Sequence, residues 1–308
     1  MRNSCRTEKQ GDQRRDAYPE SKVSFRTKMV AMLGVLFVGL RIFGAAEVVD
    51  GITWLYEVEG STVRIGGSLS TGPQAISIST SGAITIPSRL GGKPVTSIGH
   101  DAFACCNGLT SVTIPSSVKD IGANAFFMCE GLLSVEIPPS VTSIGEKAFY
   151  GCSELKAVTI PSSVMSWGRQ AFAECGSLTT VTILNGVTEI GDSAFWMCDA
   201  LTSVTIPSSV TSIGWHAFSG CSGLTSVTIP SSVTSIGGYA FEDCRGLTSV
   251  VIPSTVTSVG GEAFYGCSSL KSATIPASVT RISYIFPAES LESVVISEGV
   301  TSIGHWLF

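Results

Sequence analysis

The residues best suited to chemistry in this sequence are its cysteines. There are ten in 308 residues, and eight of them recur every 23 residues from Cys106 to Cys267. Equivalent side chains in stacked coils would lie about 4.8 Å apart, whereas the β-carbons of a disulfide lie about 3.8 Å apart. We therefore expect a buried ladder of reduced thiols, with oxidation of neighbouring pairs as the alternative. Cys105 falls outside this ladder and is expected to be the more reactive thiol.

Neither metal binding nor catalysis is indicated. A one-dimensional row of thiols does not converge on one point, as a tetrahedral metal site requires. The three histidines, at 100, 216 and 305, lie in different repeats. His216 is three residues from Ser219, but no repeated acid orients the imidazole. The glycines recur with the turns and form no phosphate-binding loop. We expect no enzyme, no cofactor and no metal.

A unit of 23 residues must position these side chains, and it is clearest at 201–223, which reads LTSVTIPSSVTSIGWHAFSGCSG. A close internal repeat of this length is typical of stacked, solenoid architectures. Leucine and phenylalanine keep the interval throughout: Leu109, Leu132, Leu155, Leu178, Leu201, Leu224, Leu247 and Leu270; Phe103, Phe126, Phe149, Phe172, Phe195, Phe218, Phe241 and Phe264.

Each unit contains one clear strand pattern. In residues 201–207, valine and isoleucine alternate with serine and threonine, which favours a strand, and Pro207 ends it. Residues 208–214 return to the core and turn at Gly214. Residues 215–221 have the spacing of one helical turn or a tight loop. We therefore predict an α/β-type solenoid with 23-residue coils, a parallel β-sheet on one face, and turns and short helical segments elsewhere.

The solenoid is predicted to occupy residues 83–308 as about nine to ten coils, the last of them degenerate. One coil cannot bury its apolar face alone, so neighbours and terminal caps must cover it. Residues 47–82 are interpreted as the N-terminal cap, and the alternating pattern at 51–67 suggests that it contains a hairpin. At about 4.8 Å per coil, nine coils would extend about 45 Å.

Residues 1–46 differ from the rest and are interpreted as a leader with a signal peptide. Basic residues precede an apolar core at 29–40, and small residues follow, with cleavage expected after Ala46. An uncleaved membrane anchor is the alternative, although Arg41 ends the apolar run before the ~20 residues that a spanning helix needs. We expect a secreted or cell-surface protein, in contact with the membrane only through this leader if it is uncleaved.

Without the leader, ten basic and twenty acidic residues remain, a net charge near −10. Such a charge repels phosphate groups, so we do not expect nucleic acid as a partner. Charged residues make up only 14% of the chain. The surface must therefore consist largely of hydroxyl-bearing side chains.

The repeated pattern LxxVxIPxxVxxIGxxAFxxC resembles the BspA-like, or Treponema-type, leucine-rich repeat of surface proteins. The resemblance covers about residues 83–308. It implies a leucine-rich repeat fold and an exported or surface-attached protein that adheres to host matrix proteins or to other cells.

One candidate binding surface is the outward side of the predicted strands. A regular array of hydroxyls there could bind a glycan, or could simply keep the sheet soluble. The array consists of Ser111, Ser134, Thr180, Ser203, Ser226, Ser249 and Ser272 in one row, and of Thr113, Thr159, Thr182, Thr205, Thr228 and Thr274 in the other.

The other candidate is the set of letters that change between units, on either side of the Ala-Phe pair. Tyr and Trp are enriched at protein interfaces, so this ridge is predicted to bind a protein ligand. Packing of the rings against neighbouring coils is the alternative. A structural surface or spacer protein without a specific ligand is a further alternative function. The predicted ridge residues are Phe127, Tyr150, Trp196, Trp215, His216, Tyr239 and Tyr265.

Overall fold

The computed structural model describes residues 44–67, 74–279, 286 and 290–298. The chain divides into two units, residues 1–42 and 43–308, and every described residue belongs to the second. The predicted leader core at 29–40 lies outside the described residues. None of the described residues belongs to a helix long and apolar enough to span a membrane.

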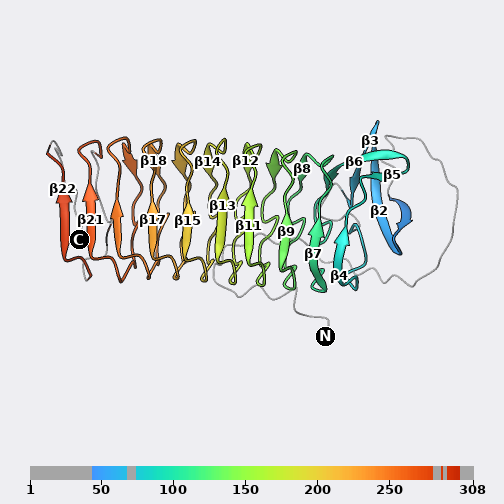
Figure 1. Cartoon of the computed structure of the whole chain (residues 1–308), viewed down its shortest axis with the longest axis horizontal. Coiled ribbons are helices and arrows are strands. Elements are labelled where there is room, and N and C mark those ends of the chain that lie inside the picture. Colours follow the sequence, from blue (N-terminus) through green and yellow to red (C-terminus); the bar gives the residue numbers. More distant parts are fainter. Residues whose placement is uncertain (1–43, 68–73, 280–285, 287–289, 299–308) are drawn as a thin grey trace, which may run out of the picture. The chain divides into compact units, whose positions relative to one another are not determined.

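The second unit is a parallel β-solenoid with coils of about 23 residues, about nine of them stacked in register (Figure 1). The strand predicted in each coil forms the first sheet. Its strands pair without slippage over most of its length, as Val181 opposite Val204 illustrates. The paired strands are β4 (Gly82–Thr85), β7 (Leu109–Thr113), β9 (Ser134–Glu136), β11 (Ala157–Ile160), β13 (Thr180–Ile183), β15 (Ser203–Thr205) and β17 (Ser226–Thr228). On the same side follow β19 (Ser249–Val251), β21 (Ser272–Ile275) and β22 (Ser293–Ile296), which pair with one another but not with β17.

A second parallel sheet lines another side of the solenoid, where only turns and helical segments were expected. A short segment of each coil, which reads SI in several of them, pairs with neighbouring coils, as Ile213 does with Ile236. These strands are β6 (Lys93–Ile98), β8 (Asp120–Ile121), β10 (Ser143–Ile144) and β12 (Ser166–Trp167), then β14 (Glu189–Ile190), β16 (Ser212–Ile213), β18 (Ser235–Ile236) and β20 (Ser258–Val259). β5 (Arg89–Leu90) pairs with β6 alone.

The described residues contain no helix, so the predicted helical segments and the α/β class are wrong. The Ala-Phe region instead forms a corner of tight turns, in which Phe127 N–H donates to Asn124 O, three residues earlier. The corner has two residues with positive φ in each coil, such as Asn124 at 54° and Met128 at 54°. Two left-handed residues, four positions apart in each corner, reverse the chain direction and prevent helix propagation.

The corner is bonded to the next coil by three backbone hydrogen bonds, all in one direction. Phe126 N–H donates to Ala148 O at 2.7 Å, and Met128 N–H donates to Tyr150 O at 2.7 Å. The equivalent bonds recur from Asp101 to Asp243. Inter-coil bonding of this kind replaces the internal bonds that a helix would make.

The core is a set of side-chain ladders, one for each conserved letter of the unit. The eight repeated phenylalanines are fully buried, and their rings stack from Phe103 to Phe264. Each buried thiol from Cys129 to Cys267 donates to the backbone carbonyl of a phenylalanine in the preceding coil, as Cys221 does to Phe195 O at 3.2 Å. These ladders hold the corner and both sheets together.

An antiparallel meander covers the first coil. It consists of β1 (Ala45–Val49), β2 (Ile52–Glu59) and β3 (Thr62–Ile65), and β3 joins the second sheet through β6. Trp54, which is 1% exposed, meets the ring of Phe103 edge-on at 6.3 Å. This indole shields the first ring of the phenylalanine ladder from water.

Candidate functional site

The ridge that the sequence singled out lies on the corner. We define the variable ridge as the two residues before and the two after the Ala-Phe pair of each coil. One residue of each pair has positive φ, including His216 at 51°, Tyr239 at 58° and Met197 at 57°. Because β-carbon clashes disfavour this conformation for residues other than glycine, asparagine and aspartate, these positions are less free to vary than the sequence indicated.

The structure brings the predicted ridge residues together in two groups. In the first, Phe127 and Tyr150 stack with centroids 5.3 Å apart, and Lys147 lies 5.6 Å from the Tyr150 ring. In the second, His216 stacks on Tyr239 at 4.7 Å, and Trp215 lies 6.3 Å from Tyr239. Trp196 and Tyr265 belong to neither group.

Exposure separates these residues further. Trp215 and Tyr265 are 57% and 56% exposed. Phe127, Tyr150, Trp196, His216 and Tyr239 are half-buried. Some of the rings therefore pack across neighbouring coils, which was the alternative for the ridge, while Trp215 and Tyr265 present their rings to solvent.

Carboxylates link the second group of ridge residues. The Ser219 hydroxyl donates to Glu242 at 2.9 Å, and His216 Nδ1 lies 3.4 Å from the same carboxylate. The Tyr239 hydroxyl donates to Glu262 at 3.1 Å, and this bond raises the pKa of the tyrosine. In a catalytic triad the base contacts the nucleophile directly. Here the Ser219 hydroxyl and His216 Nδ1 both contact the Glu242 carboxylate, and Ser219 is only 2% exposed. The arrangement therefore stabilises the ridge instead of activating the serine.

The cysteine ladder is confirmed. The eight cysteines from Cys106 to Cys267 are free and buried. Burial raises the pKa of Cys106 to about 11 and that of Cys267 to about 12, and it raises those of the cysteines between them further. Such thiols are neutral and unreactive near neutral pH. Cys105 is disulfide-bonded, so the prediction of a reactive free thiol there is wrong.

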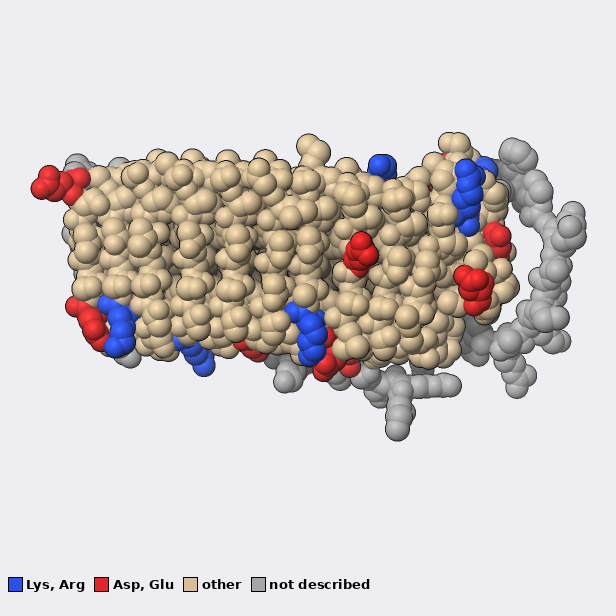
Figure 2. Space-filling model, viewed as in Figure 1, with Lys and Arg blue, Asp and Glu red and all other residues tan. Residues whose placement is uncertain are grey.

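The hydroxyl rows lie on the outer side of the first sheet. Strand pairing places Ser203 opposite Ser226, and Thr205 lies opposite Thr228. Most members of both rows are exposed. This side of the solenoid faces the viewer in Figure 2, where charged side chains lie mainly along the margins. Glu136 on β9 interrupts the threonine row. Binding of a glycan to this face stays a prediction.

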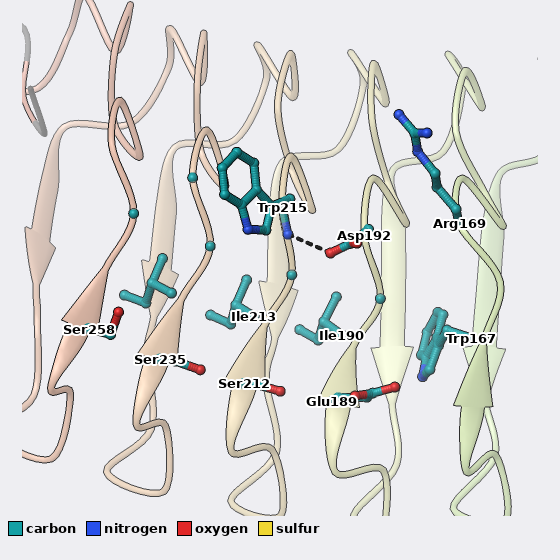
Figure 3. A pocket seen from close by; sticks show the side chains of 16 residues that line it. Trp167, Arg169, Glu189, Ile190, Asp192, Ser212, Ile213, Trp215, Ser235 and Ser258 are labelled. Carbon is teal, nitrogen blue, oxygen red and sulfur yellow. Dashed lines mark hydrogen bonds between the residues drawn. The ribbon is translucent and has the colours of Figure 1, made fainter.

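A groove on the second sheet was not predicted from the sequence. The groove has a volume of about 520 Å³ and extends across β12, β14, β16, β18 and β20 (Figure 3). Glycines and serines supply much of its lining, while Trp167 and Trp215 contribute their indoles. Arg169, Glu189 and Asp192 are exposed at its β12–β14 end.

The groove follows from one residue, Trp167. It occupies the position that isoleucine holds in most other coils, and its ring lies edge-on to Phe172 and Phe195, at 6.3 and 5.9 Å. At this junction the second sheet is interrupted, because β12 and β14 are not paired. Gly168 N–H and Gly214 N–H each donate to the preceding coil, but Gly191 N–H has no backbone acceptor among the described residues.

The opening is confined to one side. On the first sheet β11, β13 and β15 remain paired across the same coils. At the corner, Phe172 N–H still donates to Ala194 O at 2.9 Å. A tryptophan in an isoleucine position could have been noticed in the sequence, but its effect on pairing depends on the distance between coils.

Across the described residues, no three His, Cys, Asp or Glu side chains are grouped as ligands for a metal ion.

The repeat identifies the class of protein. The family described as the BspA type leucine rich repeat region matches residues 82–202 and 188–308, in six copies. The chain therefore belongs to the BspA-type leucine-rich repeat family. No curated protein matches it in sequence.

Two solved structures are similar to this chain. The leucine rich repeat protein of T. pallidum is 29% identical, with a TM-score of 0.56 over 70% of this chain and 87% of that one. A leucine-rich repeat protein from Bacteroides ovatus is 26% identical, with a TM-score of 0.55 over 84% of this chain and 78% of that one. Both support the leucine-rich repeat solenoid.

Proposed function

We propose that this protein is exported and binds a partner protein through the variable ridge, without a catalytic step. The observation that carries the proposal is the arrangement of Trp215, Tyr239 and Tyr265 in three consecutive coils. The outer two rings are more than half exposed, and the middle ring is held by its stack on His216. Pre-positioned aromatic rings bury large areas on binding and lose little side-chain entropy.

Family membership supports this function, because leucine-rich repeat proteins typically act in protein interaction. Host matrix or cell-surface proteins are the partners that we propose, with the cell surface or the medium as the location. Glu242, Asp243 and Glu262 lie along the same coils and favour a partner with a basic surface. The Ser219 hydroxyl donates to Glu242 and not to the His216 imidazole, which supports a non-catalytic role.

The test uses a Trp196→Ser, Tyr265→Ser double variant and a Trp215→Ser, Tyr239→Ser double variant. Their retention on purified extracellular matrix proteins and on intact cells is compared with that of the parent protein. We expect at least about a tenfold loss for the second pair, because hot-spot aromatics each contribute ~2 kcal/mol or more. Val251→Ser, which removes an exposed apolar side chain from the first sheet, is the control.

Unchanged retention of both folded double variants would refute the ridge and favour a spacer without a specific ligand. Export is tested separately, by locating the protein in culture fractions and sequencing its mature N-terminus. A protein found only inside the cell contradicts that part of the proposal.

A further inference from the structure

The groove on the second sheet contains hydrogen-bond donors that the fold itself does not use. Trp167 Nε1 is buried and has no hydrogen-bond partner. Gly191 N–H has lost the acceptor that its equivalents have in neighbouring coils. Buried donors are nearly always paired, so two unused donors at one junction indicate a place where another group accepts.

Acceptors and further donors surround this pair. Figure 3 shows the Glu189 side chain extending toward the indole of Trp167. Ser212, Ser235 and Ser258 continue from Glu189 along the axis, one in each coil. A ligand here must accept from N–H groups and donate to a carboxylate within the same short segment. A hydroxyl group does both.

Trp215 adds a flat apolar surface to this polar lining. Its backbone N–H donates to the Asp192 carboxylate at 2.8 Å, which holds the backbone of Trp215 in place. The indole is 57% exposed. The indole lies close to Gly238, where an added β-carbon would be only 3.1 Å from the ring, so the glycine allows this close approach. An exposed indole beside hydroxyls and carboxylates suits a ring with an apolar C–H face and a hydroxylated rim, as in a pyranose sugar.

Other ligand classes fit less well. Glu189 and Asp192 outnumber Arg169 at the β12–β14 end of the groove, which disfavours an anion. Ile190 and Ile213 form the floor of the groove, but they are at most 2% exposed and so offer little apolar surface to a lipid. A peptide strand inserted between β12 and β14 would require these two strands to lie about 4.8 Å farther apart. The phenylalanine spacing widens only from 4.9 Å to 5.8 Å there.

We propose that this groove binds a neutral oligosaccharide, stacked on Trp215 and hydrogen-bonded at the Trp167 junction. Five consecutive coils line it, a length of about 20 Å at one coil per ~4.8 Å, which suits a chain of several sugar units. The site lies on the second sheet, apart from the hydroxyl rows of the first. It also takes a different ligand class from the protein partner of the ridge.

The experiment titrates the protein with neutral tetrasaccharides, namely cellotetraose, maltotetraose, mannotetraose and xylotetraose, and with the acidic tetragalacturonate. Calorimetry and tryptophan fluorescence report binding. We expect at least one neutral tetrasaccharide to bind, tetragalacturonate to bind more weakly, and Trp215→Ala to lower the affinity at least about tenfold. Trp167→Ile is expected to have the same effect by restoring the pairing of β12 with β14.

Trp196→Ser and Tyr265→Ser are the matched controls, because both remove ridge aromatics that do not line the groove. They should retain saccharide binding even where they weaken binding to a protein partner, so failure of the two proposals can be told apart. The groove proposal is overturned if no neutral tetrasaccharide binds, if only the acidic one binds, or if Trp215→Ala leaves the affinity unchanged. Because Trp215 is exposed, its variant tests the site even if Trp167→Ile does not fold.

Discussion

The rings of Phe172 and Phe195 lie 5.8 Å apart, centroid to centroid, whereas the three preceding pairs of the ladder are each 4.9 Å apart. The wider gap coincides with Trp167, which is edge-on to both rings. Spacings beyond it remain between 5.2 and 5.5 Å. Trp167, in place of the usual isoleucine, thus lies where the closely spaced part of the phenylalanine ladder meets the more widely spaced part.

Amide hydrogen exchange should reveal this junction. Gly191 N–H is expected to exchange faster than Gly168 N–H and Gly214 N–H, because only the latter two donate to a preceding coil. In Trp167→Ile the Gly191 amide should gain protection by at least about tenfold. Equal protection of the three amides in the parent protein would contradict the interrupted pairing.

Removing a ring from the phenylalanine ladder should strongly destabilise the solenoid. Phe218 is fully buried and stacks on Phe195 and Phe241 at 5.5 and 5.4 Å. Phe218→Ala should lower the free energy of unfolding by about 3–5 kcal/mol, as for other buried aromatic residues. Urea denaturation measures it, with Tyr265→Ala as the exposed control, expected within about 0.5 kcal/mol of the parent. A Phe218→Ala variant as stable as this control would refute the ladder as a source of stability.

The buried thiols should make the fold sensitive to alkali. Below the ordinary thiol pKa of 9.0 these cysteines are protonated in both the folded and the unfolded state, and pH does not change stability through them. Above it the unfolded chain loses protons, while the folded thiols do not until about pH 11 at Cys106 and about pH 12 at Cys267. Stability therefore falls as pH rises, by up to about 1.4 kcal/mol per pH unit for each thiol.

Thermal melts between pH 8 and pH 11 measure this slope. Cys221→Ala removes one titrating group and should make the decline shallower, although the variant starts from a lower stability. A melting temperature that is constant across this range contradicts the neutral, buried state of the ladder.

The ridge position just before the cysteine is a glycine in three coils, at Gly151, Gly220 and Gly266, and a larger residue in the coil before each of them. Gly220, at φ 78°, lies under Met197, and an added β-carbon would be 2.6 Å from the Met197 sulfur. Gly220→Ala should cost about 1–2 kcal/mol, because of both the left-handed backbone and this contact. Combining it with Met197→Ala should recover about 0.5–1 kcal/mol as a coupling energy.

Denaturation of the two single variants and the double variant gives the coupling. Gly176→Ala serves as the control, since an added β-carbon there meets nothing within 4 Å. Strict additivity would show that Met197 does not restrict Gly220.

The period of 23 residues was enough to predict the stacked coils, the first sheet and the buried thiols. It did not predict the second sheet, because a strand of two residues, such as Ser212 and Ile213, is too short to show an alternating pattern. It also left open whether residues 217–221 form a helical turn or a tight loop. The spacing of buried residues is similar in a helical turn and in turns with left-handed residues, and only the backbone angles distinguish them.

The candidate sites were predictable to different degrees. Variation between coils located the ridge, but it did not show that His216 and Tyr239 stack on each other, since this depends on how far each ring extends across the next coil. The groove was missed because Trp167 replaces one apolar residue with another. Its consequence is the unpaired N–H of Gly191 in the next coil, and no change in the polarity of the sequence marks that position.

The one-directional hydrogen bonds of the corner give the stack an electrical polarity. Their N–H groups all point toward the C-terminal neighbour, so the peptide dipoles add, and carbonyl oxygens face the N-terminal end. An open row of acceptors could receive the donors of another copy head to tail, and repetition of that contact would build a filament. Here Ala75 N–H binds Ala102 O at 2.6 Å, and the Gln74 amide binds Ala104 O. Gln74 and Ala75 thus occupy carbonyl oxygens of the first corner to which another copy of the chain could otherwise bind.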